Sequence, residues 1–213
     1  MIYPPLSLDF HLPAIQVQTE EGQTVAIQDL IQSKNPADLT LLIPGFTHCQ
    51  GVCPLLVQTY KKLLEVDSHR SISVIFFSFD PQDTAKELQD FHTTQGAPPS
   101  WRFIRADGKN TQQLLDALQV TVMKVGDGFD HPVQVFGFSS NLTWVGSLYG
   151  FDVTANEVEQ LYAKAQMQAT SPMLYNVVSR IKNPNTLAIY GGAGCMISLL
   201  VIFYCLYSGR RKK

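Results

Sequence analysis

Two cysteines, Cys49 and Cys53, stand close together in the first third of the chain. With three residues between them, their sulfurs can converge on one point or close a small disulfide ring. Such a pair favours thiol chemistry, because a thiolate attacks disulfides and binds soft metal ions such as Cu(I). The sequence around the pair must therefore decide between redox, metal-binding and purely structural roles.

The elements on either side of the pair predict a strand, a dithiol loop and a helix. The apolar run Leu39 to Ile43 is bounded by Pro44-Gly45, as expected of a buried strand. Pro54 is tolerated in the first turn of a helix, and the apolar residues after it have helical spacing. These residues are Leu55, Leu56, Tyr60, Leu63 and Leu64. Both sulfurs are then near a helix N-terminus, where free amides and the helix dipole lower a thiol pKa.

Three kinds of site compete for this loop. A structural disulfide or two unreactive buried thiols is the simplest alternative. A zinc site is less favoured, because no second cysteine pair or histidine pair lies at zinc-ligand spacing elsewhere in the chain. A reactive dithiol or a two-sulfur Cu(I) site is the preferred interpretation, with Cys49 and Cys53 as its centre.

Three segments resemble the Sco/SenC family and occur in that family's order. The segment Phe46-Thr47-His48-Cys49-Gln50-Gly51-Val52-Cys53-Pro54 is similar to its cysteine signature, and Ser78 to Thr84 to its aspartate-proline segment. Asp130-His131 resembles its aspartate-histidine motif. The likeness covers roughly residues 8 to 165.

The resemblance implies a thioredoxin-like fold and a function in cytochrome c oxidase assembly. Family members deliver copper to the dinuclear copper centre of the oxidase or reduce its cysteines, so the implied cofactor is copper and the implied partner is the oxidase subunit with that centre. It also makes His131 the third metal ligand beside Cys49 and Cys53. Two thiolates and one imidazole give a three-coordinate Cu(I) site.

Neighbouring polar residues receive supporting roles. A carboxylate could fix the tautomer of His131, and Asp130 and Asp80 are both candidates. His48 could stabilise the Cys49 thiolate, although adjacent side chains often diverge. Asp83 is interpreted as a helix cap rather than a catalytic group, and the sequence does not decide whether the bond before Pro132 is cis. The remaining histidines lie in polar or terminal surroundings and are expected to be solvated; they are His11, His69 and His92.

Composition sets broad limits on function. The 213 residues are 45% hydrophobic and 16% charged, with a formal net charge of −2. No basic stripe with interleaved aromatic residues is present, so nucleic acid is not an expected partner. The other two cysteines, Cys195 and Cys205, lie in a long apolar segment and are interpreted as packing residues.

The rest of the chain predicts an α/β sandwich with a mixed sheet, in thioredoxin-like order with an N-terminal hairpin extension. Residues 1–168 are assigned to this domain. The hairpin is expected to pair Phe10–Leu12 with Gln23–Ile27. The other predicted strands are 72–79, 101–104, 133–138 and 142–148, with 120–125 extended and with helices after Asp83 or Thr84, at 111–118 and at 153–165.

The C-terminal part predicts one transmembrane helix. Residues 169–185 are interpreted as a linker, and residues 186–208 are 23 positions without a charge. At ~1.5 Å rise per residue this length crosses a hydrocarbon core of ~30 Å. The basic tail 209–213 favours a cytoplasmic C-terminus, which places the domain on the periplasmic side of an inner membrane. No signal peptide is visible, Sco proteins usually carry an N-terminal anchor, and a cytosolic domain on a tail anchor stays an alternative.

Two functions from different classes fit these residues. The first is a membrane-anchored copper chaperone that holds Cu(I) through Cys49, Cys53 and His131. The second is an enzyme, a thiol-disulfide oxidoreductase in which Cys49 attacks and Cys53 resolves the mixed disulfide; a peroxidase is a weaker third. The three-residue spacing leans toward metal, since thioredoxin-type exchangers use two, and only copper binding needs His131.

Overall fold

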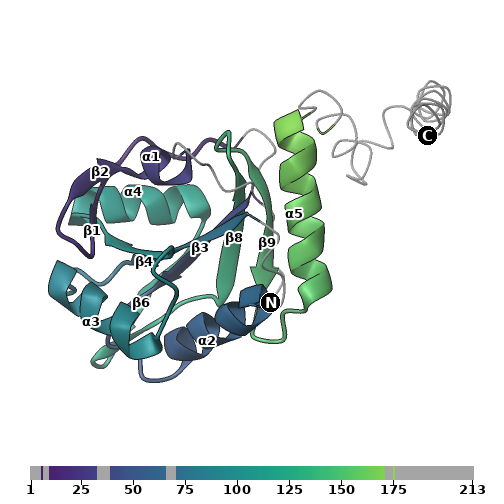
Figure 1. Ribbon diagram of the computed structural model, residues 1–213. Coiled ribbons are helices and arrows are strands. Elements are labelled where there is room, and N and C mark those ends of the chain that lie inside the picture. Colours follow the sequence, from purple (N-terminus) through teal and green to yellow (C-terminus); the bar gives the residue numbers. More distant parts are fainter. Residues whose placement is uncertain (1–5, 7–9, 33–38, 66–70, 171–174, 176–213) are drawn as a thin grey trace, which may run out of the picture. The chain divides into compact units, whose positions relative to one another are not determined.

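The computed structural model describes residues 6, 10–32, 39–65, 71–170 and 175. The chain divides into two compact units, Met1–Pro172 and Met173–Lys213. All helices and strands named below belong to the first unit (Figure 1).

Two buried parallel strands form the centre of the domain, β3 (Leu39–Gly45) and β4 (Ile72–Ser78). They pair in register from Leu39 opposite Ile72 to Gly45 opposite Ser78. Every residue of β3 is buried, as expected of a strand covered on both faces by helices. The predicted strands at 39–43 and 72–79 are confirmed.

The two central strands belong to a seven-stranded sheet in the order β2-β1-β5-β4-β3-β8-β9. Pairing is parallel within β3-β4-β5 and antiparallel elsewhere, so the predicted mixed sheet is confirmed. The remaining strands of this sheet are β1 (Gln16–Thr19), β2 (Thr24–Ala26), β5 (Arg102–Arg105), β8 (Gln134–Ser139) and β9 (Trp144–Tyr149).

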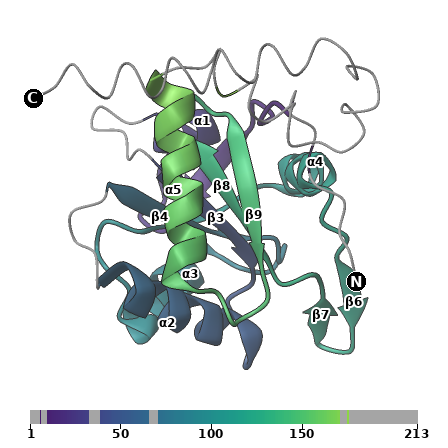
Figure 2. The same cartoon turned by 90° about the vertical axis from the view of Figure 1, so that its right-hand side faces the viewer.

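Helices cover both faces of the sheet, and Figure 2 shows α4 and α5 on opposite sides of it. Helix α5 packs on β8 and β9, where Gly146 (φ +149°) lies under Leu161; a Cβ at Gly146 would come within 2.6 Å of that leucine. The helices are α1 (Ile27–Ile31), α2 (Val52–Glu65), α3 (Ala85–Gln95), α4 (Gly108–Leu118) and α5 (Ala155–Thr170). Except for the short α1, each corresponds to a predicted helix.

Helix α3 has clear end signals. The Thr84 side chain accepts a hydrogen bond from the Glu87 backbone while the Glu87 carboxylate accepts one from the Thr84 backbone, which is a capping box. Gly96 ends the helix in the left-handed conformation. Thr84 is thus the N-cap, and the interpretation of Asp83 as the cap is wrong.

The N-terminal hairpin exists, but its first strand is β1 and not Phe10–Leu12. Alternate positions of β1 are buried, with Val17 and Thr19 facing the core, and Gln16 pairs with Ala26. Pro13 lacks the amide hydrogen that a ladder needs, which explains why the strand begins after it. The prediction also missed α1, which begins at Ile27 where a strand residue was expected.

A second, two-stranded sheet was not predicted. Strands β6 (Met123–Val125) and β7 (Gly128–Asp130) form a hairpin around Gly126-Asp127, with Met123 opposite Asp130. Gly126 has φ +59°, which a two-residue hairpin turn requires. Within the described part of the chain, this hairpin pairs with no strand of the larger sheet.

His92 corrects the expectation of a solvated side chain. It lies in the last turn of α3, stacks on Phe103 with ring centroids 4.4 Å apart, and is mostly buried. Its Nδ1 lies 3.4 Å from the carboxylate of buried Glu20, and its Nε2 donates to the Pro98 carbonyl at 3.1 Å. This cluster joins the N-terminal hairpin to α3 and β5.

The predicted C-terminal segments fall largely beyond the described residues. The span 186–208 and the tail 209–213 lie wholly outside them, and of the linker 169–185 only Ala169 and Thr170, in α5, and Tyr175 are described. Among the residues that the structure does describe, no helix has both the length and the apolar character to cross a membrane.

Candidate dithiol and metal centre

The dithiol lies where the carboxyl end of β3 leads into α2. Cys53 is fully buried in the first turn of α2, whereas Cys49 in the preceding loop is partly exposed. Both are free thiols, and the Cys53 amide donates to Cys49 Sγ at 3.4 Å. The predicted strand, dithiol loop and helix are confirmed, and both cysteines are at the helix N-terminus.

The two sulfurs differ in acidity. The Cys53 thiol donates a hydrogen bond to Cys49 Sγ, and with the amides of Cys53, Gly51 and Val52 it lowers the pKa of Cys49 to about 5, against the effect of burial. The same hydrogen bond, together with burial, raises the pKa of Cys53 far above its usual range. At neutral pH the pair is one partly exposed thiolate beside one buried thiol, so the lowered pKa expected of this loop belongs to Cys49 alone.

Gly45 makes room for the buried sulfur. A Cβ at this position would lie 2.9 Å from Cys53 Sγ and 2.8 Å from the Phe76 ring, closer than real Cβ contacts. The sequence suggested that Pro44-Gly45 merely ends the strand. In the structure both residues are part of β3, and the missing side chain of Gly45 lets the dithiol helix approach it.

His131 follows β7 and presents one nitrogen as a potential ligand. Its Nδ1 donates to the Pro132 carbonyl at 3.0 Å, and because a carbonyl only accepts, Nε2 is left with its lone pair. The orienting group is thus a backbone carbonyl rather than Asp130 or Asp80. Burial lowers the pKa of His131, while the negative charge of Cys49 acts in the opposite direction. A neutral imidazole is the form that binds metal.

An aromatic cluster holds His131 beside the dithiol loop. The His131 ring packs edge-on against Phe79, with centroids 4.9 Å apart, and against Phe46 at 6.3 Å. Phe129 of β7 contacts both phenylalanines at 5.1 Å and 5.6 Å. Since Phe46 belongs to the dithiol loop and Phe79 follows β4, three segments distant in sequence converge here. All peptide bonds of the described residues are trans, including the one before Pro132.

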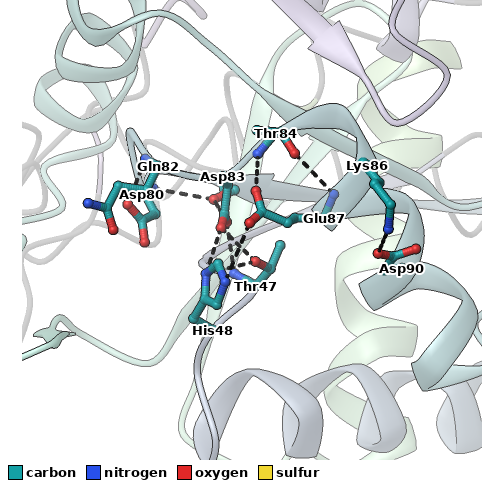
Figure 3. Close-up of polar contacts among 10 residues, drawn as sticks. Thr47, His48, Asp80, Gln82, Asp83, Thr84, Lys86, Glu87 and Asp90 are labelled. Carbon is teal, nitrogen blue, oxygen red and sulfur yellow. Dashed lines mark hydrogen bonds and ion pairs between the residues drawn. The ribbon is translucent and has the colours of Figure 1, made fainter.

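Asp83 is a functional candidate that the sequence interpretation missed. Its side chain is fully buried, and it accepts four hydrogen bonds (Figure 3). Thr47 donates through its amide at 2.9 Å and its hydroxyl at 2.5 Å, His48 donates through Nδ1 at 3.1 Å, and Ser78 donates through its hydroxyl. Thr84 and Glu87 form the capping box of α3, so Asp83 is not needed as the cap. This Thr84/Glu87 pattern was the sequence signal that Asp83 has another role.

His48 points toward this carboxylate. Its ring is 57% exposed, with Nε2 lying 3.6 Å from Glu87 Oε1. The groups that lower the pKa of Cys49 are the Cys53 thiol and backbone amides. The suggestion that His48 stabilises the Cys49 thiolate therefore gains no support from the structure.

One group in the described part of the chain brings three possible metal-ligand atoms within 4.8 Å of one another, namely His48, Asp80 and Asp83. Because Asp83 already accepts four hydrogen bonds, its oxygens have little capacity left for a cation. Cys49, Cys53 and His131 do not form a group of that closeness. Ligation by all three requires the imidazole and the sulfurs to approach, and it stays a prediction.

Comparison with known proteins gives one family and a set of related folds. A sequence model described as SCO1/SenC matches residues 18–166, whereas no curated protein matches the chain. A candidate electron transfer protein from Aquifex aeolicus VF5 is 25% identical, with a TM-score of 0.69 over 78% of this chain and 98% of its own.

Two further solved structures share the fold. Arabidopsis thaliana ScoI, crystallised with copper bound, is 18% identical, with a TM-score of 0.61 over 75% of this chain and 99% of its own. BsSco, described as a cytochrome c oxidase assembly protein with a disulfide switch, is 20% identical, with a TM-score of 0.63 over 78% of this chain and 98% of its own. The thioredoxin-like fold predicted from the sequence is confirmed.

Proposed function

Because the chain belongs to the SCO1/SenC family, we propose that it is a copper(I) chaperone for cytochrome c oxidase. Its cargo is Cu(I), held by Cys49, Cys53 and His131, and its acceptor is the oxidase subunit with the dinuclear copper site. The observation that carries the proposal is the packing of His131 against Phe46 of the dithiol loop, with a lone pair on Nε2, together with the lowered pKa of Cys49. Soft thiolates select Cu(I) over harder divalent ions.

Each ligand has a distinct part in this function. Partly exposed Cys49 meets the incoming ion first, because it is already deprotonated at neutral pH. Cys53 becomes the second thiolate by releasing its proton to solvent as the ion binds. His131, harder than sulfur and placed directly after a separate hairpin, controls entry and release. The resulting site has a net charge of −1, which two thiolates and one monovalent cation require.

The proposal includes a membrane anchor at residues 186–208. Its support is the sequence: 23 positions without a charge, followed by a basic tail at 209–213. The tail then lies in the cytoplasm, and the copper site in residues 1–168 faces the periplasm, with 169–185 as the linker. This arrangement puts the site on the same side of the membrane as its proposed acceptor.

Metal stoichiometry tests the proposal. The full-length chain with Cys195→Ala and Cys205→Ala, purified in mild detergent, is loaded with Cu(I) under anaerobic conditions, since this background leaves only the dithiol. We expect one copper per chain, no copper after Cys49→Ser/Cys53→Ser, and weaker retention after His131→Ala. Unchanged affinity in the histidine variant would exclude His131 as a ligand.

The second candidate function is thiol-disulfide exchange, favoured by the acidity difference within the dithiol. The Cys49 thiolate attacks a substrate disulfide and releases one substrate thiolate, which takes up the proton of Cys53. Cys53 then attacks Cys49 Sγ and releases the second substrate thiolate. The substrate disulfide gains two electrons, and the dithiol becomes a disulfide. A chain that binds no stable copper but reduces a disulfide in one turnover would be an oxidoreductase. His131→Ala should leave that turnover intact.

A further inference from the structure

We propose that Asp83 is a positioning residue, which fastens the dithiol loop to the start of α3 so that Cys49 stays beside Cys53. The inference rests on the proposed function, because its consequence concerns copper and disulfide chemistry at these two sulfurs. It assigns a role to a carboxylate that itself touches neither sulfur nor cargo.

The burial of the Asp83 side chain is energetically costly. Asp83 is a fully buried carboxylate with no lysine or arginine among its hydrogen-bond partners. Burying such a charge is unfavourable unless hydrogen bonds replace its hydration. Four donors aimed at its two oxygens supply that replacement, and Figure 3 shows those of Thr47 and His48. A plain helix cap would need one donor, and Thr84 already provides the cap.

The donors to Asp83 come from the dithiol loop and from the central sheet. Three of the four belong to Thr47 and His48, the two residues immediately before Cys49. The fourth belongs to Ser78 at the end of β4, and the Asp83 amide donates to the Asp80 carbonyl at 3.2 Å. The carboxylate thus joins the loop side of the dithiol to the central sheet.

The two sulfurs depend on this tie to different degrees. Cys53 is fixed by its helix and by its close approach to Gly45. Cys49 is in a loop. Among the described residues, its sulfur is bonded only by groups of the same loop and of the first turn of α2, and its amide donates to the Phe46 carbonyl at 3.4 Å. A disulfide and a copper complex both require the sulfurs to be held together, whereas the reduced dithiol does not. Loss of the hydrogen bonds between Asp83 and the loop should therefore destabilise the disulfide and the copper complex relative to the reduced dithiol.

The substitution Asp83→Asn distinguishes the effect of the hydrogen bonds of Asp83 from the effect of its negative charge. In Asp83→Asn, a side-chain amide nitrogen in place of Oδ1 would face the Thr47 hydroxyl and His48 Nδ1, which can reverse their donor and acceptor roles. The remaining side-chain oxygen would keep the bond to the Thr47 amide, a group that can only donate. Asp83→Asn therefore retains the backbone tie and loses the charge, while Asp83→Ala loses both.

The test uses the full-length chain in the Cys195→Ala/Cys205→Ala background. Cu(I) affinity is measured by competition with a chromophoric chelator, and the dithiol-disulfide equilibrium is measured against glutathione. We expect Asp83→Ala to lower both equilibrium constants about tenfold, which for the disulfide is ~30 mV. Asp83→Asn should recover most of both losses. Thr84→Ala, which removes the α3 cap beside Asp83, is the matched control and should change neither.

Other outcomes would overturn the inference in recognisable ways. Equal effects of Asp83→Asn and Asp83→Ala would mean that Asp83 acts through its charge, and no effect of either would mean that the tie is irrelevant to the sulfurs. An equal loss in Thr84→Ala would mean that any disruption of the start of α3 has this effect, and that Asp83 has no specific role in positioning the loop. If Asp83→Ala fails to fold, Thr47→Val takes its place, because it removes the hydroxyl that donates to Asp83 Oδ1. A loss in both equilibrium constants then supports the tie, and wild-type values overturn it. Absence of copper from the wild type would reject the proposed function alone, since the glutathione equilibrium tests the tie without metal.

Discussion

Two histidine-carboxylate pairs lie at the two ends of α3, and the same chemical groups have different roles there. At the start of the helix, His48 is largely exposed and its partner Asp83 is fully buried. In the last turn, His92 is only 16% exposed and its partner Glu20 is buried as well. The first pair adjoins the dithiol, and the second joins the N-terminal hairpin to the body of the domain.

The two histidine rings differ in their exposure and in their remaining contacts. Both nitrogens of His92 face acceptors, Glu20 and the Pro98 carbonyl, and the ring is stacked on Phe103. His48 has one face in solvent, and its partner carboxylate also holds Thr47 and Ser78. A histidine beside a carboxylate therefore says little about function until the remaining contacts are known. The domain therefore has a reactive end and a structural end, which substitutions can distinguish.

The largest effect is expected at the exposed sulfur. In the background without Cys195 and Cys205, Cys49→Ser should slow alkylation by iodoacetamide at pH 7 by at least about a hundredfold, because Cys53 is fully buried and that burial by itself raises the pKa of its thiol. Cys53→Ser is the control and should keep a fast-reacting thiol. Comparable rates in the two variants would contradict the division of labour within the dithiol.

The next effect concerns packing at the reactive end. Gly45→Ala would push a methyl group against Cys53 Sγ and Phe76, and overpacking of this kind costs about 1–3 kcal/mol in the free energy of unfolding. Denaturant unfolding followed through the buried Trp101 and Trp144 measures it. Gly51→Ala, at a position with open space around it, is the matched control. Equal stability of the two variants would mean that the helix can move away without loss.

The acidity of Cys49 gives a pH profile. With a pKa of about 5 the thiolate predominates at pH 7, and its fraction falls as the pH drops through that value. Between pH 7 and pH 4 the alkylation rate of the wild type should fall only about tenfold, because one unit below the pKa leaves about one tenth as thiolate. A rate still rising steeply above pH 7 would indicate an ordinary thiol.

The smallest effect is expected at the structural end. Glu20→Gln keeps an acceptor for the Phe103 amide but removes the charge that faces His92. We expect a loss of about 1 kcal/mol in the free energy of unfolding, with unchanged copper stoichiometry and alkylation rate. A change in the dithiol chemistry would show that the two ends of α3 are coupled, and the contrast between them would fail.

Sequence reasoning succeeded where one local pattern decided the structure. The apolar runs of β3 and β4 and the helical spacing after Pro54 each identify an element without help from the rest of the chain. The location of Cys49 and Cys53 at the N-terminus of α2 likewise follows from their position between a predicted strand and a predicted helix.

It failed where the outcome depended on distant partners. The role of Asp83 depends on Thr47 and His48, which donate to its carboxylate from 36 and 35 positions earlier in the chain. The sequence around His92 indicates a solvated side chain, but the N-terminal hairpin brings Glu20, which is distant in the sequence, next to its ring. The β6–β7 hairpin has its signal in Gly126-Asp127, yet the short strands beside it have too few residues to show a period.

That hairpin has a consequence for engineering. Because β6 and β7 bond to each other and to no described strand of the main sheet, the segment that delivers His131 can be exchanged as a cassette without breaking a hydrogen bond of the main sheet, provided that the replacement keeps the contacts of Phe129 with Phe46 and Phe79. The dithiol and the imidazole are in this sense separate modules on one scaffold. Shortening the cassette would leave a two-sulfur exchanger, and grafting a different one would change the coordination number offered to an ion while the thiols stay where they are.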